Sequence, residues 1–350
     1  MLYGANGYTG ELIAREAVRR GEKPILAGRN PAAISALARE LGCPSRAFPL
    51  DNHQIVVNAL QGLALVLHCA GPFVETSAPM VAACLEAGVH YLDITGEISV
   101  FEAIFARDAE AKQRGVTLLP GVGFDVVPTD CLAGMLSARL PSATELSLAF
   151  DSPGAALSRG TMKTMIEGIG DGGAIRKDGK IVRVPVAFEA REIPFASGPR
   201  MAVTIPWGDV STAFRTTGIP NIRVYSGASP TSIAQTRRMR LLLPLAGWKP
   251  IRRLLQSFAA RRPGPSAEQR AKGRVNLWGR VADGKGGEVT MTMTTPEGYA
   301  FTVLSALAAV KRVMQTAPAS GSTTPALCFG ADFVTTIDGV AVTPTVAASH

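Results

Sequence analysis

The first third of the chain alternates between short apolar runs and stretches in which apolar residues recur every three or four positions. The short runs predict buried parallel strands, and the longer stretches predict amphipathic helices. The predicted strands are 24–27, 46–50, 63–69, 90–94 and 116–119, and the predicted helices are 8–20, 31–41, 76–87 and 98–114. Because strands that alternate with helices form a doubly wound parallel sheet, we expect an α/β fold with a Rossmann-type domain over residues 1–125.

After residue 125 the pattern changes, because several strand-like segments follow one another. These are 145–150, 181–186, 201–205, 222–225 and a hairpin of 275–281 with 288–294, followed by an apolar helix over 299–314. Such a pattern favours a second, α+β domain with a mixed sheet. We expect this domain to span 126–337, to bind the substrate and to form a homodimer, and we expect 338–350 to be a loosely held tail.

A glycine-rich loop opens the chain. Gly4, Gly7 and Gly10 lie at three-residue spacing between a short strand and the helix 8–20. In a dinucleotide-binding turn the glycines serve a tight turn, a close approach to the pyrophosphate and the packing of helix on strand. The phosphates would lie at the positive end of the helix. The alternative is a glycine-rich turn that binds no ligand.

The next predicted strand leads into Gly28-Arg29-Asn30. An NAD-binding fold usually has an acidic residue here that holds the ribose 2′-hydroxyl, whereas an arginine suits the 2′-phosphate of NADP. We therefore expect NADP, with an Arg29 that only caps a helix as the alternative. The residues expected to bind the cofactor are Gly4, Asn6, Gly7, Tyr8, Thr9, Gly10, Gly28, Arg29, Asn30, Asp51, Ala70, Gly71 and Pro72.

The strand before the glycine loop is unusually short. Only Leu2 and Tyr3 precede Gly4, while a central strand normally has about five or six residues. This predicts that the native protein begins several residues upstream, which sequencing its N-terminus would test.

Composition describes a folded protein, with 47% apolar and 18% charged residues in 350. The five cysteines form no C-x-x-C or Cys/His pattern, so we expect no metal site, no disulfide framework and a cytoplasmic location.

The net charge of +8 is concentrated in one segment. Residues 237–274 carry eleven lysine or arginine residues and a single acid, Glu268, interleaved with leucines and Trp248. This composition is typical of an interfacial anchor, so we expect a peripheral contact with an anionic membrane. A solvated helical hairpin or a dimer contact is the alternative. Nucleic acid is not expected as a partner, because the segment has too few aromatic residues for base stacking.

Hydride transfer also requires a proton source near the carboxyl ends of the strands. The candidates are Asp125, Glu97, Tyr91 and Lys163, with Asp125 preferred because it follows the last strand. Asp125 and Glu97 could instead cap helices, and Tyr91 could be a packing residue. His68 fits a buried core histidine better than a titratable group. The turn-rich runs 206–209 and 216–221 could be substrate-facing loops or structural turns.

Several motifs together resemble the saccharopine dehydrogenase-like oxidoreductases, over about residues 3–335. They are Gly4–Gly10, Cys69-Ala70-Gly71-Pro72-Phe73, Tyr91 to Glu97, Gly123-Phe124-Asp125 with Pro128 and Asp130, Ser158 to Thr161, Pro206 to Asp209, Thr217 to Asn221, Glu297-Gly298-Tyr299, and Thr324-Pro325 through Phe333. The motifs resemble the bacterial branch of that family, some of whose members are labelled trans-acting enoyl reductases.

The resemblance implies an NADP-dependent oxidoreductase. Together with the basic, apolar segment it favours a reductase of an apolar or lipid-linked enoyl substrate. One alternative is a saccharopine-type enzyme acting on a C–N bond, but its tricarboxylate substrate would need a denser cluster of cations than the second domain offers. Another is a non-catalytic NADP-binding protein associated with a membrane.

Overall fold

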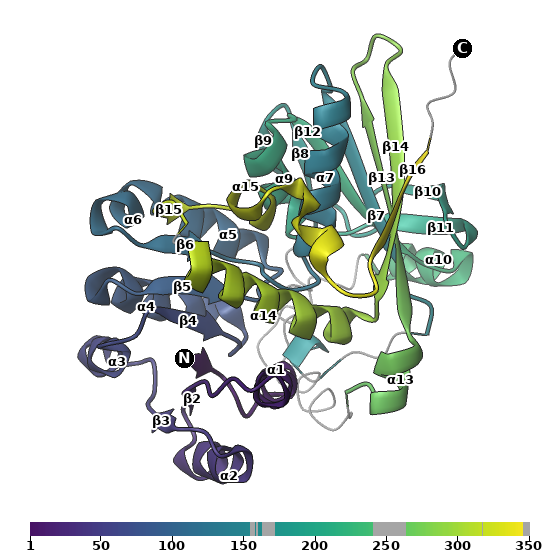
Figure 1. Ribbon diagram of the computed structural model, residues 1–350. Helices are drawn as coiled ribbons and strands as arrows, with labels where there is room; N and C mark the ends of the chain where they lie inside the picture. The colour runs from purple at the N-terminus through teal and green to yellow at the C-terminus, as the bar shows by residue number, and fades with distance from the viewer. Residues whose placement is uncertain (155–157, 159, 163–171, 241–263, 317, 346–350) are drawn as a thin grey trace. The chain divides into compact units, whose positions relative to one another are not determined.

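The computed structural model describes the chain except for residues 155–157, 159, 163–171, 241–263, 317 and 346–350 (Figure 1). The chain divides into two compact units. The first unit comprises Met1–Val127 with Phe301–Phe329, and the second comprises Pro128–Ala300 with Gly330–His350. The expected division at residues 125 and 126 is therefore close, but residues 301–329 belong to the first unit and not, as expected, to the second.

The first unit contains a seven-stranded parallel sheet with the strand order β15-β6-β5-β4-β1-β2-β3. Its strands are β1 (Leu2–Tyr3), β2 (Leu26–Gly28), β3 (Ser45–Ala47), β4 (Leu65–His68), β5 (His90–Asp93), β6 (Thr117–Leu119) and β15 (Gly321–Ser322). This confirms the doubly wound Rossmann-type sheet. Strand order reverses between β1 and β4, and ligands of such sheets bind at that point, beside the carboxyl ends of the strands.

Helices connect these strands. They are α1 (Tyr8–Arg19), α2 (Pro31–Leu41), α3 (His53–Leu60), α4 (Phe73–Ala87), α5 (Ile98–Phe105), α6 (Asp108–Arg114), α14 (Gly298–Thr316, in this unit from Phe301) and α15 (Pro325–Phe329). The helix predicted over 98–114 is thus two helices. The core under them contains Val66, Met80 and Leu118, all fully buried.

The second unit contains a mixed nine-stranded sheet, as expected from the sequence. Its main order is β10-β11-β12-β7-β13-β14-β16, with β8 and β9 attached through β12, and β12 runs parallel to β7 while the other pairs are antiparallel. The strands are β7 (Glu145–Asp151), β8 (Gly173–Lys177), β9 (Lys180–Val184), β10 (Ala190–Phe195), β11 (Gly198–Thr204), β12 (Asn221–Gly227), β13 (Arg274–Ala282), β14 (Glu288–Pro296) and β16 (Ala341–Thr345).

The helices of this unit are α7 (Val127–Arg139), α9 (Asp209–Thr217), α10 (Pro230–Met239), α13 (Ala267–Lys272) and the 3-10 helix η2 (Ala331–Thr336). α7 packs on the sheet at Gly279, where a Cβ atom would lie 2.6 Å from Leu136 Cδ1. On β13 the neighbouring Trp278 is buried with Ile193 and Tyr225 in a second cluster. The expected tail differs from the structure, because β16 pairs with β14.

Most of the basic segment 237–274 lies outside the described residues. Within its described ends, Arg237 and Arg240 donate to the backbone oxygen of Ala187, and Arg240 also donates to that of Val186. These two cations therefore fasten α10 to the chain before β10. In the part of the chain that the structure describes, no helix is long and apolar enough to span a membrane.

Candidate functional site

The glycine loop has the geometry of a close backbone crossing. Gly4 has a φ of +84°, and a Cβ atom there would lie 2.7 Å from the backbone nitrogen of Ala70. A Cβ atom at Gly10 would lie 2.2 Å from the oxygen of Gly4. Gly7 is the N-cap of α1 and has no side chain to occupy the space before the helix. The loop is thus a cradle that only glycine permits, as a bound pyrophosphate requires.

Asn6 and Gly28 join this loop to β2. A Cβ atom at Gly28 would lie 3.1 Å from Asn6 Oδ1, so glycine at the end of β2 makes room for the loop. The next two residues, Arg29 and Asn30, are exposed. Asn30 Oδ1 accepts a hydrogen bond from Ala33 N at 3.1 Å and caps α2, as the sequence predicted. Arg29 is left at the carboxyl end of β2, beside the glycine loop.

Arg29 and Asp51 both lie close enough to Tyr3 to influence its phenol. Burial is the main cause that raises the pKa of Tyr3 to about 12, while Arg29 lowers it and Asp51 raises it further. The hydroxyl donates to the backbone oxygen of Phe48 at 3.0 Å. The structure therefore brings the predicted cofactor residues Arg29 and Asp51 together around the end of β1.

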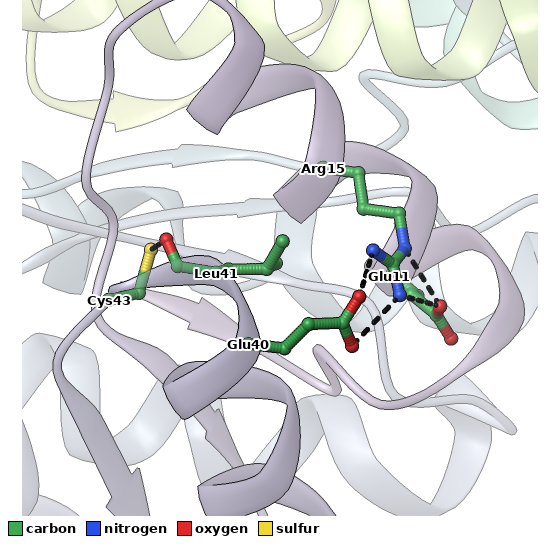
Figure 2. A network of polar contacts seen from close by, with 5 residues as sticks. All are labelled: Glu11, Arg15, Glu40, Leu41 and Cys43. Carbon is green, nitrogen blue, oxygen red and sulfur yellow. Dashed lines mark hydrogen bonds and ion pairs between the residues drawn. The ribbon is translucent and has the colours of Figure 1, made fainter.

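An ion-pair network holds α1 and α2 together, and these are the helices that follow the glycine loop and Arg29. Arg15 donates to Glu11 Oε1 at 2.9 Å within α1 and to Glu40 Oε1 at 2.7 Å in α2 (Figure 2). Figure 2 also shows Cys43 Sγ contacting the backbone oxygen of Leu41 just after α2.

The loop after β4 carries Ala70, Gly71 and Pro72, and the bond between Gly71 and Pro72 is cis. Thr76 of α4 holds this loop, because its hydroxyl donates to the backbone oxygen of Ala70 at 2.6 Å. His68 Nε2 lies 3.0 Å from the same hydroxyl. His68 is fully buried, and desolvation lowers its pKa to about 3. It is therefore a buried core residue, as preferred from the sequence, although its Nδ1 has no hydrogen-bond partner among the described residues.

Glu97 is the N-cap residue of α5, as the sequence suggested, but its side chain caps another helix, α4. Its carboxylate accepts from Phe73 N at 3.1 Å and from Val74 N at 2.8 Å, the first amides of α4. Its own backbone N–H donates to Thr95 Oγ1 at 3.1 Å. A carboxylate at a helix N-terminus is stabilised in its charged form by the amides and the helix dipole. Glu97 is thus suited to stay ionised rather than to donate a proton.

Asp125 has a different environment. It is half-buried, and its carboxylate makes no hydrogen bond or ion pair with any residue that the structure describes. A Cβ atom at Gly96 would lie 2.7 Å from Asp125 Oδ2, so glycine there gives the carboxyl room. Desolvation, with a smaller effect of the Glu97 charge, raises the pKa of Asp125 to about 7. The capping alternative finds no support, because the carboxyl bonds to no amide of α7.

Tyr91 is fully buried, and its hydroxyl donates to Asp93 Oδ2 at 2.7 Å. Burial and the neighbouring Asp93 raise the pKa of Tyr91 well above its usual value. The phenol is therefore a poor proton donor enclosed in the core. Lys163, the fourth candidate, lies outside the described residues.

Asp93 is a residue that sequence reasoning did not single out. It is fully buried at the end of β5, and Oδ1 accepts from Thr95 N at 3.0 Å and from Gly121 N at 2.8 Å. Burial raises its pKa to about 6. Its place at the carboxyl end of a parallel strand was the available signal.

Two residues from α14 hold the loop that carries Asp125. Thr302 Oγ1 accepts from Phe124 N at 3.0 Å, and Ser305 Oγ donates to the oxygen of Val122 at 2.8 Å. The sequence did not predict the roles of Thr302 and Ser305, because the apolar pattern of a buried helix does not indicate which loop the helix contacts.

In the second unit the turn-rich runs are structural at the residues whose contacts are known. Asp209, which is fully buried, accepts from the Thr129 hydroxyl at 2.9 Å, and Asp130 accepts from the Thr216 hydroxyl. Both contacts join α7 to α9. Among the described residues, no group of histidine, cysteine and acidic side chains could hold a metal ion.

Comparison with known proteins agrees with this arrangement. Residues 1–119 match the family described as saccharopine dehydrogenase NADP binding domain. The mouse protein named saccharopine dehydrogenase-like oxidoreductase is 29% identical over 204 residues, which are 51% of this chain and 47% of that protein. A Mycobacterium tuberculosis protein named as a proposed trans-acting enoyl reductase is 32% identical over 180 residues, 48% of this chain and 43% of that protein.

The fold of the chain can also be compared with solved structures. Saccharopine dehydrogenase (L-Glu forming) from Saccharomyces cerevisiae aligns over 99% of both chains with a TM-score of 0.66 and 11% identity, a likeness of fold. The matched region spans less than half the length of the two curated relatives above. Residues 1–119 therefore match the saccharopine dehydrogenase NADP binding domain in sequence, and the chain as a whole shares the fold of the yeast saccharopine dehydrogenase.

Proposed function

We propose that the protein is an NADP-dependent reductase that transfers hydride to an apolar or lipid-linked enoyl substrate, with Asp125 as the proton donor. The observation that carries this proposal is the Asp125 carboxyl, which has no hydrogen-bond partner among the described residues and a pKa raised to about 7. Such a group is half protonated near neutral pH, as a general acid requires.

The residues divide the work of the reaction between them. The Gly4–Gly10 cradle would hold the pyrophosphate of a bound NADPH, which would supply a hydride for one carbon of the double bond. Asp125 donates its proton to the other carbon and recovers one from solvent afterwards. Glu97, fixed by the amides of Phe73 and Val74, keeps a negative charge near Asp125 and so favours its protonated form.

Arg29 supports NADP over NAD. It is exposed at the end of β2, beside the loop, and the chain has no acidic residue at Gly28, Arg29 or Asn30 to hold a ribose 2′-hydroxyl. We expect Arg29→Ala to weaken NADPH binding about tenfold and to leave NADH binding unchanged. Fluorescence titration of both nucleotides measures this. Arg39→Ala, which removes another exposed arginine of the same unit, is the matched control.

Equal binding of NADPH and NADH by the unaltered protein would contradict the NADP assignment. Absence of both would contradict the enzyme proposal and favour a binding protein without turnover.

The substrate class is tested by a panel. NADPH consumption is followed with enoyl thioesters of increasing chain length. In parallel it is followed with glutamate plus an aldehyde, which tests the alternative reaction at a C–N bond (the C–N arm). Turnover that rises with acyl chain length supports the proposal. Turnover with the C–N arm alone would replace it by a saccharopine-type reaction.

The basic, apolar composition of 237–274 supports a substrate presented at an anionic membrane surface, and we include this peripheral contact and a homodimer in the proposal. Flotation with anionic vesicles, against neutral vesicles as the control, tests the membrane contact. Analytical ultracentrifugation without lipid tests the dimer. A dimer that binds neither the anionic nor the neutral vesicles would show that residues 237–274 have another role.

A further inference from the structure

One buried side chain in the first unit connects the ends of two neighbouring strands, β5 and β6. Asp93 closes β5, which lies between β4 and β6 in the sheet. Its Oδ1 accepts from Thr95 N at 3.0 Å and from Gly121 N at 2.8 Å, and its Oδ2 accepts from the Tyr91 hydroxyl at 2.7 Å. Its backbone oxygen accepts from Val122 N at 2.8 Å. Asp93 is therefore bonded to its own strand, to the residues that follow it and to the segment after β6.

One branch of these contacts leads to Glu97. Thr95, whose amide is held by Asp93, accepts the Glu97 amide through its hydroxyl at 3.1 Å. Glu97 in turn binds the first amides of α4, at the end of the loop that follows β4. The position of the Glu97 backbone thus depends on Asp93 through a single intervening residue.

The other branch leads to Asp125. Asp93 holds the amides of Gly121 and Val122, which begin the loop that carries this carboxyl. The spacing between the two branches is tight, because a Cβ atom at Gly96 would lie 2.7 Å from Asp125 Oδ2.

We propose that Asp93 is a positioning residue, which sets where the carboxyl groups of Glu97 and Asp125 stand relative to each other. This inference rests on the proposed role of Asp125 as the proton donor. The physical reason is that one buried carboxyl oxygen accepts from an amide of each loop. If either loop moved, a buried N–H would lose its partner, so the two loops keep one arrangement relative to each other. Asp93 does this work without contacting substrate.

Variants separate position from charge. Asp93→Ala removes the side-chain acceptor for the amides of Thr95 and Gly121, and keeps only the backbone bond from Val122 N. Asp93→Asn keeps a carbonyl oxygen at that place and loses only the charge, and the Tyr91 hydroxyl can then accept from the new amide. Thr95→Val cuts only the branch to Glu97, and it decides the question if Asp93→Ala does not fold. Thr117→Val is the matched control, because Thr117 is equally buried on β6 but its hydroxyl donates to the oxygens of Pro318 and Ala319.

The readout is the titration of Asp125 itself, followed without substrate by carboxyl-¹³C NMR of the full chain. Asp125→Asn identifies the resonance by its loss. Glu97 is the charged group that faces Asp125, while Tyr91 and Cys69 face Asp93. We expect Asp93→Ala and Thr95→Val to lower the titration midpoint by at least about half a pH unit, because the carboxyl group of Glu97 moves away from Asp125. Asp93→Asn and Thr117→Val should match the unaltered protein.

Two results would overturn the inference. One is an unchanged midpoint in both Asp93→Ala and Thr95→Val. The other is an equal shift in Asp93→Asn and Asp93→Ala, since charge rather than position would then be the cause. The NMR result does not depend on turnover, so the expected shifts in a protein inactive toward every enoyl probe would refute the proposed reaction and leave the positioning role in place. With an active probe, Asp93→Ala should lower kcat at least tenfold while the Kd of NADPH changes less than twofold.

Discussion

In the second unit the buried carboxyl groups of Asp130 and Asp209 accept hydrogen bonds from threonine hydroxyls, whereas in the first unit the Asp125 carboxyl has no such partner among the described residues. Both sets belong to polar, turn-rich motifs, and from the sequence alone both are candidates for a functional site. The difference lies in whether the carboxyl group accepts a hydrogen bond from another part of the fold. A carboxyl that accepts such a bond joins two helices, and one that accepts none among the described residues remains available for chemistry.

The variant Asp125→Asn tests most directly whether the carboxyl without a partner is the one that takes part in the chemistry. An amide cannot donate the required proton as a carboxylic acid does, so we expect kcat to fall roughly 10²–10⁴-fold with an active enoyl probe. NADPH affinity, measured by fluorescence titration, should stay the same because the glycine cradle is intact. Asp338→Asn alters an exposed carboxyl of the second unit and is the control. A variant that keeps a third of its kcat would exclude Asp125 as the donor.

The opposite result is expected for Asp209→Ala. Removing a buried acceptor leaves the Thr129 hydroxyl without this bond and opens a cavity, so unfolding in urea should show a loss of roughly 2–4 kcal/mol. The Kd of NADPH should not change. If the variant were as stable as Asp338→Ala, the contact would not be structural.

Stability should also depend on pH in a way that identifies Asp125. Its pKa is raised from 3.8 to about 7, so the folded protein favours the protonated carboxyl. This contribution is fully present below the unfolded pKa and is lost as pH rises through about 7. Asp125→Asn has no carboxyl to ionise and should therefore be more stable than the unaltered protein above neutrality, by roughly 1–3 kcal/mol. Denaturant titrations from about pH 4 to pH 8 measure this, and a stability difference between the two proteins that does not change over this range would contradict it.

The smallest effect is expected for Arg15→Ala, which removes the network of Figure 2. The side chains of Arg15 and Glu40 are 42% and 56% exposed, so solvent screens the pair and the loss should stay below about 1 kcal/mol. Thermal unfolding beside Arg39→Ala tests this. A larger loss would mean that the orientation of α2 relative to α1 depends on this pair.

Much of the first unit could be predicted because its signals are local. The glycine spacing, the Asn30 cap and the apolar runs each act within a few residues, and the parallel sheet follows from their alternation. The role of Glu97 could not be predicted, because it caps a helix whose first amide lies 24 residues earlier in the chain. Similarly, the apolar pattern of α14 shows that the helix is buried but not what it contacts. The pairing of β16 could not be predicted either, because it depends on the free edge of β14, which only the folded sheet provides.

The return of residues 301–329 to the first unit also determines when that unit can be completed during synthesis. The glycine loop and most of the sheet leave the ribosome early, but α14 follows only after the chain of the second unit up to Ala300. Until then the Asp125 loop lacks its bonds to Thr302 and Ser305, and the sheet lacks β15. The glycine loop is therefore synthesised well before α14, the helix whose side chains bond to the loop that carries Asp125.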